Sequence, residues 1–78
     1  MVRPTRVTND IRRLRFAYGE MTQAEVAEQV GVTRQTIIAI EQCRYSPSLE
    51  MAFQIAGAFG VPLDDVFQYP ATTKEISR

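Results

Sequence analysis

The chain has 78 residues, of which 45% are hydrophobic and 23% are charged, and its nine basic side chains balance nine acidic ones. This length predicts one small domain with a thin core. The chain has no histidine, the commonest general base and metal ligand, and its single cysteine cannot form an internal disulfide. We therefore expect no catalytic site, no metal site and no cofactor. The zero net charge argues against indiscriminate nucleic-acid binding.

The hydrophobic residues are spread along the chain in short runs. No run approaches the roughly twenty apolar residues of a membrane span, and no signal peptide is evident in the first residues. We therefore expect a cytoplasmic protein that does not bind membranes.

The N-terminal segment is rich in arginine. Five of the nine basic residues precede Phe16, and only one acidic residue lies among them. One interpretation is a basic face that binds phosphate, and the other is scattered charge in contact with water. Residues 1–7, which include Pro4, are expected to form a flexible arm.

A first helix is predicted to follow the arm, with Thr8 or Asn9 as its N-cap. Apolar residues recur at helical spacing on its core side. They are Ile11, Leu14 and Tyr18. Arg12 and Arg13 then point largely toward water, and residues 19–20 connect this helix to the next.

Residues 21–41 predict two short helices joined by a tight turn. Thr22 and Glu25 have the spacing of a capping box, in which each side chain binds the backbone amide of the other residue. Gly31 is placed to end the first of these helices in the left-handed conformation, and Thr33 is placed to cap the second. Core-facing apolar residues recur in both helices. They are Val26, Ala27, Val30, Ile37 and Ile40.

The outward side of the second of these helices begins with Arg34 and Gln35. In the major groove an arginine can bond bidentately to guanine, and a glutamine can bond bidentately to adenine. Ile38 and Ala39 follow on the same side, where they can contact thymine methyl groups. A short helix that is supported by another in this way is the DNA-reading helix-turn-helix. The other interpretation is a pair of amphipathic helices in an ordinary bundle.

Two further helices are predicted after this unit. Pro47 stops any continuation of the preceding helix, and Ser48 caps the longer of the two helices. The core side of that helix carries Leu49, Ala52, Ile55, Ala56 and Phe59. Gly60 ends it, and residues 63–67 form one or two more helical turns. Residues 70–78 are polar and unpatterned and are expected to be disordered.

Several motifs, in this order and spacing, resemble the lambda-repressor-like (Xre-type) helix-turn-helix family of prokaryotic transcription regulators. They are Thr22-Gln23, Ala27, Gly31-Val32-Thr33-Arg34-Gln35-Thr36-Ile37, Ile40-Glu41, Tyr45-Ser46-Pro47-Ser48-Leu49-Glu50 and Gly60-Val61-Pro62-Leu63-Asp64-Asp65-Val66-Phe67. The resemblance covers nearly all of residues 9–67. It implies an all-α domain of about five short helices over residues 8–69. The function that it implies is sequence-specific binding of double-stranded DNA by a transcriptional regulator, with repression as the expected effect.

The resemblance also implies roles for particular residues. The expected base-reading residues are Arg34, Gln35, Ile38 and Ala39. The expected phosphate-binding residues are Thr22, Gln23, Thr33, Thr36, Gln42, Arg44, Tyr45 and Ser46. An ion pair is implied between Arg15 and Glu41. Cys43 stands where the family often has glycine, and a left-handed backbone at this cysteine would cost up to about 1 kcal/mol.

A homodimer on a palindromic operator is predicted, because one reading helix covers only a few base pairs. The apolar residues left over late in the chain are expected to form its interface. They are Val66, Phe67 and Tyr69. A competing interpretation is that Phe67 merely closes the core. The alternative function is a protein-interaction module, in which the same fold binds a partner protein as an antitoxin or an adaptor does.

Overall fold

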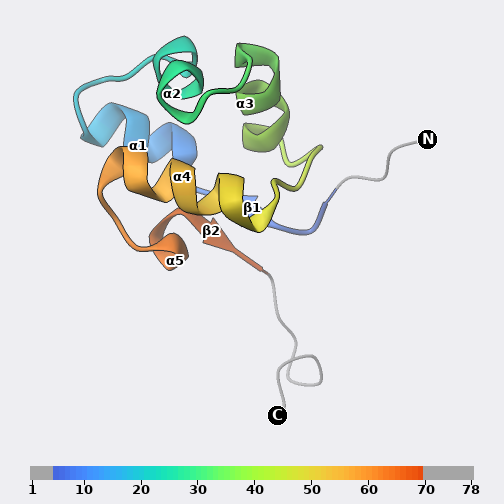
Figure 1. Ribbon diagram of the computed structural model, residues 1–78. Coiled ribbons are helices and arrows are strands. Elements are labelled where there is room, and N and C mark those ends of the chain that lie inside the picture. The colour runs from blue at the N-terminus through green and yellow to red at the C-terminus, as the bar shows by residue number, and fades with distance from the viewer. Residues whose placement is uncertain (1–4, 70–78) are drawn as a thin grey trace.

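Residues 5–69 are described by the computed structural model, and within them the chain forms five helices and one short pair of strands (Figure 1). In chain order the elements are β1 (Thr8–Asn9), α1 (Ile11–Ala17), α2 (Gln23–Val30), α3 (Arg34–Glu41), α4 (Leu49–Phe59), α5 (Leu63–Val66) and β2 (Phe67–Gln68). The helices confirm the predicted fold of five short helices. The first four residues of the predicted arm and the predicted tail at 70–78 lie outside the described residues.

The hydrophobic core lies between the helices and takes side chains from all five. α2 packs against both α3 and α4, and α5 packs against α4. The largest fully buried side chains are Ile11, Val26, Ile37, Ile40, Ile55 and Val66. Each helix therefore contributes at least one apolar side chain to the core. None of the described helices is both long and apolar enough to cross a membrane.

The ends of α2 and α3 have the predicted caps. The Thr22 hydroxyl accepts a hydrogen bond from the Glu25 amide at 3.0 Å, and the Glu25 carboxylate accepts one from the Thr22 amide at 2.8 Å. Gly31 ends α2 at φ +85°, and the Thr33 hydroxyl accepts a hydrogen bond from the Thr36 amide at 3.2 Å. The capping box, the glycine stop and the second N-cap are all confirmed. Together they set a tight turn between the two helices.

The two ends of the domain pair as a minimal antiparallel sheet, which the sequence did not predict. Thr8 faces Gln68, and Asn9 faces Phe67. The Asp10 amide extends this contact by donating to the Val66 carbonyl at 2.9 Å. Strands of two residues are too short to show an alternating pattern, so periodicity could not reveal them.

Asn9 also links three elements through its side chain. Its carboxamide oxygen accepts a hydrogen bond from the Ile11 amide at the start of α1. Its Nδ2 donates to the carbonyl of Ile40 near the end of α3, at 2.8 Å. The prediction that Thr8 or Asn9 is the N-cap of α1 is wrong, because Asp10 occupies that position without a side-chain cap. Asn9 instead binds the first helical amide from the residue before the N-cap.

Residues 5–7, which belong to the expected flexible arm, lie against the domain. The Thr5 amide donates to the carbonyl of Cys43 at 3.2 Å, and the Val7 amide donates to the Thr5 hydroxyl at 3.1 Å. The Arg6 guanidinium lies 5.3 Å from the centre of the Tyr69 ring. These contacts fasten this part of the arm to the turn after α3 and to the residue after β2.

Two residues predicted for the core lie at its edge instead. Leu49 is the first residue of α4, and 67% of it is exposed, because a side chain in the first turn of a helix points past the helix end. Tyr18 follows α1 with non-helical φ and ψ, so it leaves the helical periodicity. Its ring is exposed but still lies 6.5 Å from the ring of Phe59, measured between centroids.

Candidate nucleic-acid interface

The start of α3 presents two polar side chains to solvent. Arg34 and Gln35 are exposed, whereas Ile37 and Ile40 are buried on the other side of the helix. Side chains in the first turn point back past the helix end, so these two reach furthest from the domain. The structure therefore leaves both predicted base-reading polar groups accessible to a DNA groove.

The apolar part of the predicted reading surface is smaller. Ile38 and Ala39 are both only partly exposed, and they lie one turn further along α3 than Arg34 and Gln35. Gln42, which follows α3, is exposed. Each apolar side chain thus offers a limited patch between polar neighbours, which suits contact with a single methyl group.

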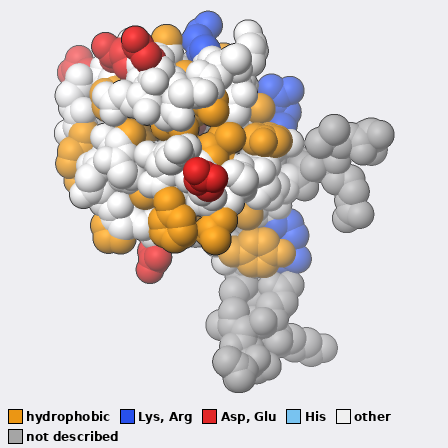
Figure 2. All heavy atoms as spheres, viewed as in Figure 1, with side chains coloured by type: hydrophobic (Ala, Val, Ile, Leu, Met, Phe, Trp, Pro, Cys, Tyr) orange, Lys and Arg blue, Asp and Glu red, His pale blue; other side chains and the backbone are white. Residues whose placement is uncertain are grey.

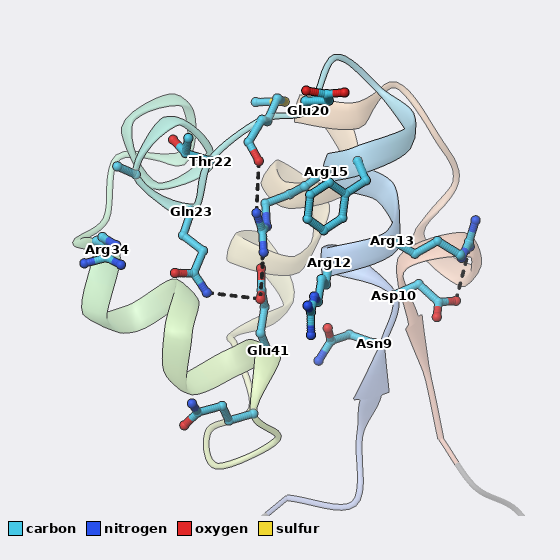
Figure 3. A pocket seen from close by; sticks show the side chains of 14 residues that line it. Asn9, Asp10, Arg12, Arg13, Arg15, Glu20, Thr22, Gln23, Arg34 and Glu41 are labelled. Carbon is cyan, nitrogen blue, oxygen red and sulfur yellow. Dashed lines mark hydrogen bonds and ion pairs between the residues drawn. The ribbon is translucent and has the colours of Figure 1, made fainter.

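An ion pair joins α1 to the end of α3 (Figure 3). The Arg15 Nε donates to Glu41 Oε2 at 2.8 Å, and the Arg15 Nη2 donates to Glu41 Oε1 at 3.3 Å. The Arg15 Nη1 also donates to the Met21 carbonyl at 3.0 Å. Only 11% of the Arg15 side chain and 9% of the Glu41 side chain is exposed. The pair that the family resemblance implied is confirmed, and it also holds the segment that leads into α2.

Gln23 is attached to the same carboxylate. Its Nε2 donates to Glu41 Oε1 at 3.1 Å, and the side chain is only partly exposed. A carboxamide nitrogen carries two hydrogens, so one remains for another acceptor while Glu41 fixes which end of the amide is the nitrogen. Sequence reasoning missed this contact, because no periodic pattern relates two residues on different helices.

The threonines of the predicted phosphate contacts have local roles at the helix starts, where Thr22 and Thr33 are N-caps and Thr36 pairs with Thr33. Thr22 uses its oxygen to accept from the Glu25 amide, which leaves its hydroxyl hydrogen to donate elsewhere. Thr33 and Thr36 lie with their hydroxyl oxygens 3.0 Å apart, so one of them donates to the other. Thr22 and Thr33 are exposed and Thr36 is partly exposed. A phosphate contact by any of them remains a prediction.

The turn after α3 carries the other predicted backbone contacts. Arg44, Tyr45 and Ser46 are all exposed there. The Arg44 amide donates to the Ala39 carbonyl at 3.0 Å, which ties the turn to α3. Cys43 has φ +60°, so the left-handed backbone considered for this position is present.

A groove of about 910 Å³ lies between α1, the start of α2 and both ends of α3 (Figure 3). Its lining includes Arg12, Arg13 and Arg15 from α1, Thr22 and Gln23 at the start of α2, and Arg34 and Glu41 from α3. The structure thus brings predicted phosphate-binding and base-reading residues to one concave surface. The groove also includes Arg12, whose side chain is exposed as predicted but was not expected to lie beside these residues.

The predicted dimer interface needs one correction. Val66 has 0% exposure and belongs to the core of the single chain, so its side chain has no surface for a partner. Phe67 is partly buried and packs against that core, as the competing interpretation held. Tyr69 is 55% exposed. Residues 63–66 form a single turn of α5, and the sequence pattern was too short to show which of its apolar residues face inward.

Neither a metal site nor a membrane segment emerges from the described residues. No group of three or more cysteine, aspartate or glutamate side chains in residues 5–69 could hold a metal ion. Every buried polar side-chain atom in this part of the chain has a hydrogen-bond partner. The buried polar atoms around the groove therefore have their partners within the described part of the chain.

Comparison with known proteins shows which family has this arrangement of helices. Residues 19–66 match the family model HTH_3, described as helix-turn-helix. The chain is 53% identical over 53 residues to an uncharacterized HTH-type transcriptional regulator of Methanocaldococcus jannaschii, and this match covers 68% of the chain and 80% of that protein. It is 32% identical over 56 residues to the immunity repressor protein of Bacillus phage phi105, covering 72% of the chain and 39% of the repressor.

A solved structure supports the same assignment. The restriction-modification controller protein of Aeromonas hydrophila superposes with a TM-score of 0.65 at 25% identity, covering 70% of this chain and 82% of that one. The family match runs from the turn after α1 to the end of α5, so it includes both caps and the exposed start of α3. The chain belongs to the helix-turn-helix family HTH_3, the lambda-repressor-like (Xre-type) family of transcriptional regulators.

Proposed function

We propose that this chain acts in the cytoplasm as a repressor that binds a specific double-stranded DNA site. The observation that carries the proposal is the exposed pair Arg34 and Gln35 at the start of a capped helix, which lies beside a groove with basic side chains. Repression is favoured over activation because a relative 32% identical to the chain is an immunity repressor. No reaction is proposed.

In this proposal α3 enters the major groove and reads bases. Arg34 and Gln35 bond to purine edges, and Ile38 with Ala39 contacts thymine methyl groups. The first backbone amides of α2 and the second Nε2 hydrogen of Gln23 donate to a phosphate of one strand. Exposed side chains in the turn after α3 bind the backbone of the opposite strand. They are Gln42, Arg44, Tyr45 and Ser46.

We further propose that two copies bind a palindromic operator. Two reading helices on a two-fold axis can lie about 34 Å apart, one turn of DNA. Exposed apolar side chains gather over α4 and the end of β2 (Figure 2). They are Leu49, Phe53 and Tyr69. With Val66 excluded, we propose that Tyr69 and the accessible part of Phe67 form the contact, with Phe53 as a neighbour.

Selection of bound duplexes from a random pool tests the proposed function. We expect one enriched motif with two-fold symmetry, and we expect repression when that motif overlaps a promoter in a reporter strain that expresses the protein. Enrichment of no motif would overturn sequence-specific binding. Activation of the reporter would overturn repression alone. An enriched motif without symmetry would overturn the palindromic dimer.

A further inference from the structure

Four of the seven charged side chains that line the groove form ion pairs with one another, which leaves two cations and one anion. Glu41 is paired with Arg15, and Asp10 accepts an ion pair from Arg13 Nη2 at 3.3 Å. Among the lining residues this leaves Arg12 and Arg34 on the basic side and Glu20 on the acidic side. No hydrogen bond or ion pair is formed by the Arg12 side chain with the residues that the structure describes, and the side chain is exposed.

The two uncompensated arginines come from different walls of the groove. Arg12 belongs to α1 and Arg34 to α3, and in the view of Figure 3 Gln23 and Glu41 lie between them. Gln23 has one Nε2 hydrogen that Glu41 does not use. The groove therefore presents a row of donors across α1, α2 and α3, and this arrangement suits an extended anion better than a compact one.

We propose that Arg12 binds a phosphate of the DNA strand that passes the start of α2, so that α1 forms part of the DNA interface. This inference rests on the proposed function, and it adds a contact that neither the sequence pattern nor the family comparison assigned. A strand of duplex DNA carries one phosphate for about every 3.4 Å of helix axis. A strand that contacts Gln23 therefore brings neighbouring phosphates over the adjacent groove wall, where the exposed guanidinium of Arg12 can donate to a phosphate oxygen.

Arg13 provides a matched control on the same helix. It neighbours Arg12 in sequence and carries the same charge, but its guanidinium is held by Asp10, on the side of α1 away from Glu41 in Figure 3. Loss of either arginine changes the net charge of the chain equally. A difference between Arg12→Ala and Arg13→Ala in DNA binding therefore reports a local contact rather than a general electrostatic effect.

The first test measures the salt dependence of binding by fluorescence anisotropy. The probes are a duplex that the parent protein selects from a random pool and a duplex of random sequence. We expect Arg12→Ala to weaken binding to both duplexes and to reduce the log–log salt slope by about 0.9 for each bound subunit. Arg13→Ala and Arg12→Lys should keep the parent slope.

The outcomes separate this inference from the proposed function. A parent protein that binds neither duplex overturns both. A parent that binds while Arg12→Ala keeps its salt slope, or while Arg12→Ala and Arg13→Ala lose the same amount, overturns only the contact from α1. Because Arg12 is exposed, its variants should keep the parent circular-dichroism spectrum, and Arg12→Gln serves as a second variant if Arg12→Ala does not fold.

The second test locates the phosphate. Single methylphosphonate linkages, which remove the charge of one phosphate at a time, are placed along the selected duplex. We expect at least one linkage per half-site that weakens the parent protein and Arg13→Ala but does not further weaken Arg12→Ala. If every linkage weakens the parent and Arg12→Ala by the same factor, Arg12 binds no phosphate.

Discussion

Arg15 and Glu41 join α1 to the end of α3 through two hydrogen bonds, the shorter of them 2.8 Å long. The same carboxylate accepts from Gln23, and the same guanidinium donates to the carbonyl that precedes α2. The position of α3 is thus fixed from both α1 and the start of α2. The DNA-binding surface that we propose on these three helices depends on this link for its geometry.

Arg15→Met should therefore lower the free energy of unfolding by about 3–5 kcal/mol, because it leaves the Glu41 carboxylate in a buried position without its ion-pair partner. Chemical denaturation measures the effect. Arg13→Met is the control, and it should cost less than about 1 kcal/mol, because the pair of Arg13 with Asp10 is largely exposed. Equal losses in free energy of unfolding would show that the buried pair stabilises the fold no more than the exposed pair does.

Base reading by Gln35 is tested by Gln35→Ala. We expect a loss of about 1–3 kcal/mol in binding to the best site, and a relaxed preference at one base pair of each half-site. A panel of duplexes with single base substitutions measures both. Gln54→Ala, a change at an exposed glutamine on α4, should leave the panel unchanged. If Gln35→Ala keeps the selectivity of the parent across the panel, Gln35 does not read a base.

The ends of α2 and the start of α3 were predictable because their chemistry is local. A capping box needs only Thr22 and Glu25 at the right spacing, and a left-handed stop needs only Gly31. The core stripe of α3 followed in the same way from Ile37 and Ile40. These features depend on neighbours within four residues, so the sequence alone displays them.

The features that were missed depend on residues far apart in the chain. The pairing of β1 with β2 brings Asn9 opposite Phe67, and two-residue strands show no period. Three helices meet at the groove, and their packing produces the bond from Gln23 to Glu41 and brings Arg12 into the lining. Val66 was misplaced because α5 has only four residues, which do not define a face.

Clamping of the DNA backbone by Arg44 is tested by Arg44→Ala. Arg44 is exposed in the turn after α3, so its removal should weaken all duplexes alike and flatten the log–log salt slope by roughly one unit for each bound subunit. Anisotropy titrations at several salt concentrations measure this slope. A change in preference at one base pair, with the slope of the parent, would instead identify Arg44 as a base reader.

The left-handed backbone at Cys43 leads to a stability prediction. Its φ of +60° disfavours a side chain, so Cys43→Gly should raise the free energy of unfolding by about 1 kcal/mol. Gly31→Ala, at φ +85°, should lower it by a similar amount. Denaturant midpoints measured under reducing conditions compare the two variants with the parent. Destabilisation by Cys43→Gly would mean that the packing of the thiol outweighs the backbone strain.

The dimer contact is tested by replacing residues on the two sides of the same segment. Tyr69 is 55% exposed and Val66 is fully buried, so the two positions separate assembly from core stability. Tyr69→Ala should shift the sedimentation-equilibrium mass toward one chain while the helix content measured by circular dichroism stays near that of the parent. Val66→Ala should lower the melting temperature instead, because it leaves a cavity beneath β2. Loss of the Arg6 contact with the Tyr69 ring should cost only about 0.5–1 kcal/mol, which is too little to unfold the chain. If the parent already sediments as a single 8.8 kDa chain at tens of micromolar without DNA, no dimer preforms, and pairing must take place on the operator itself.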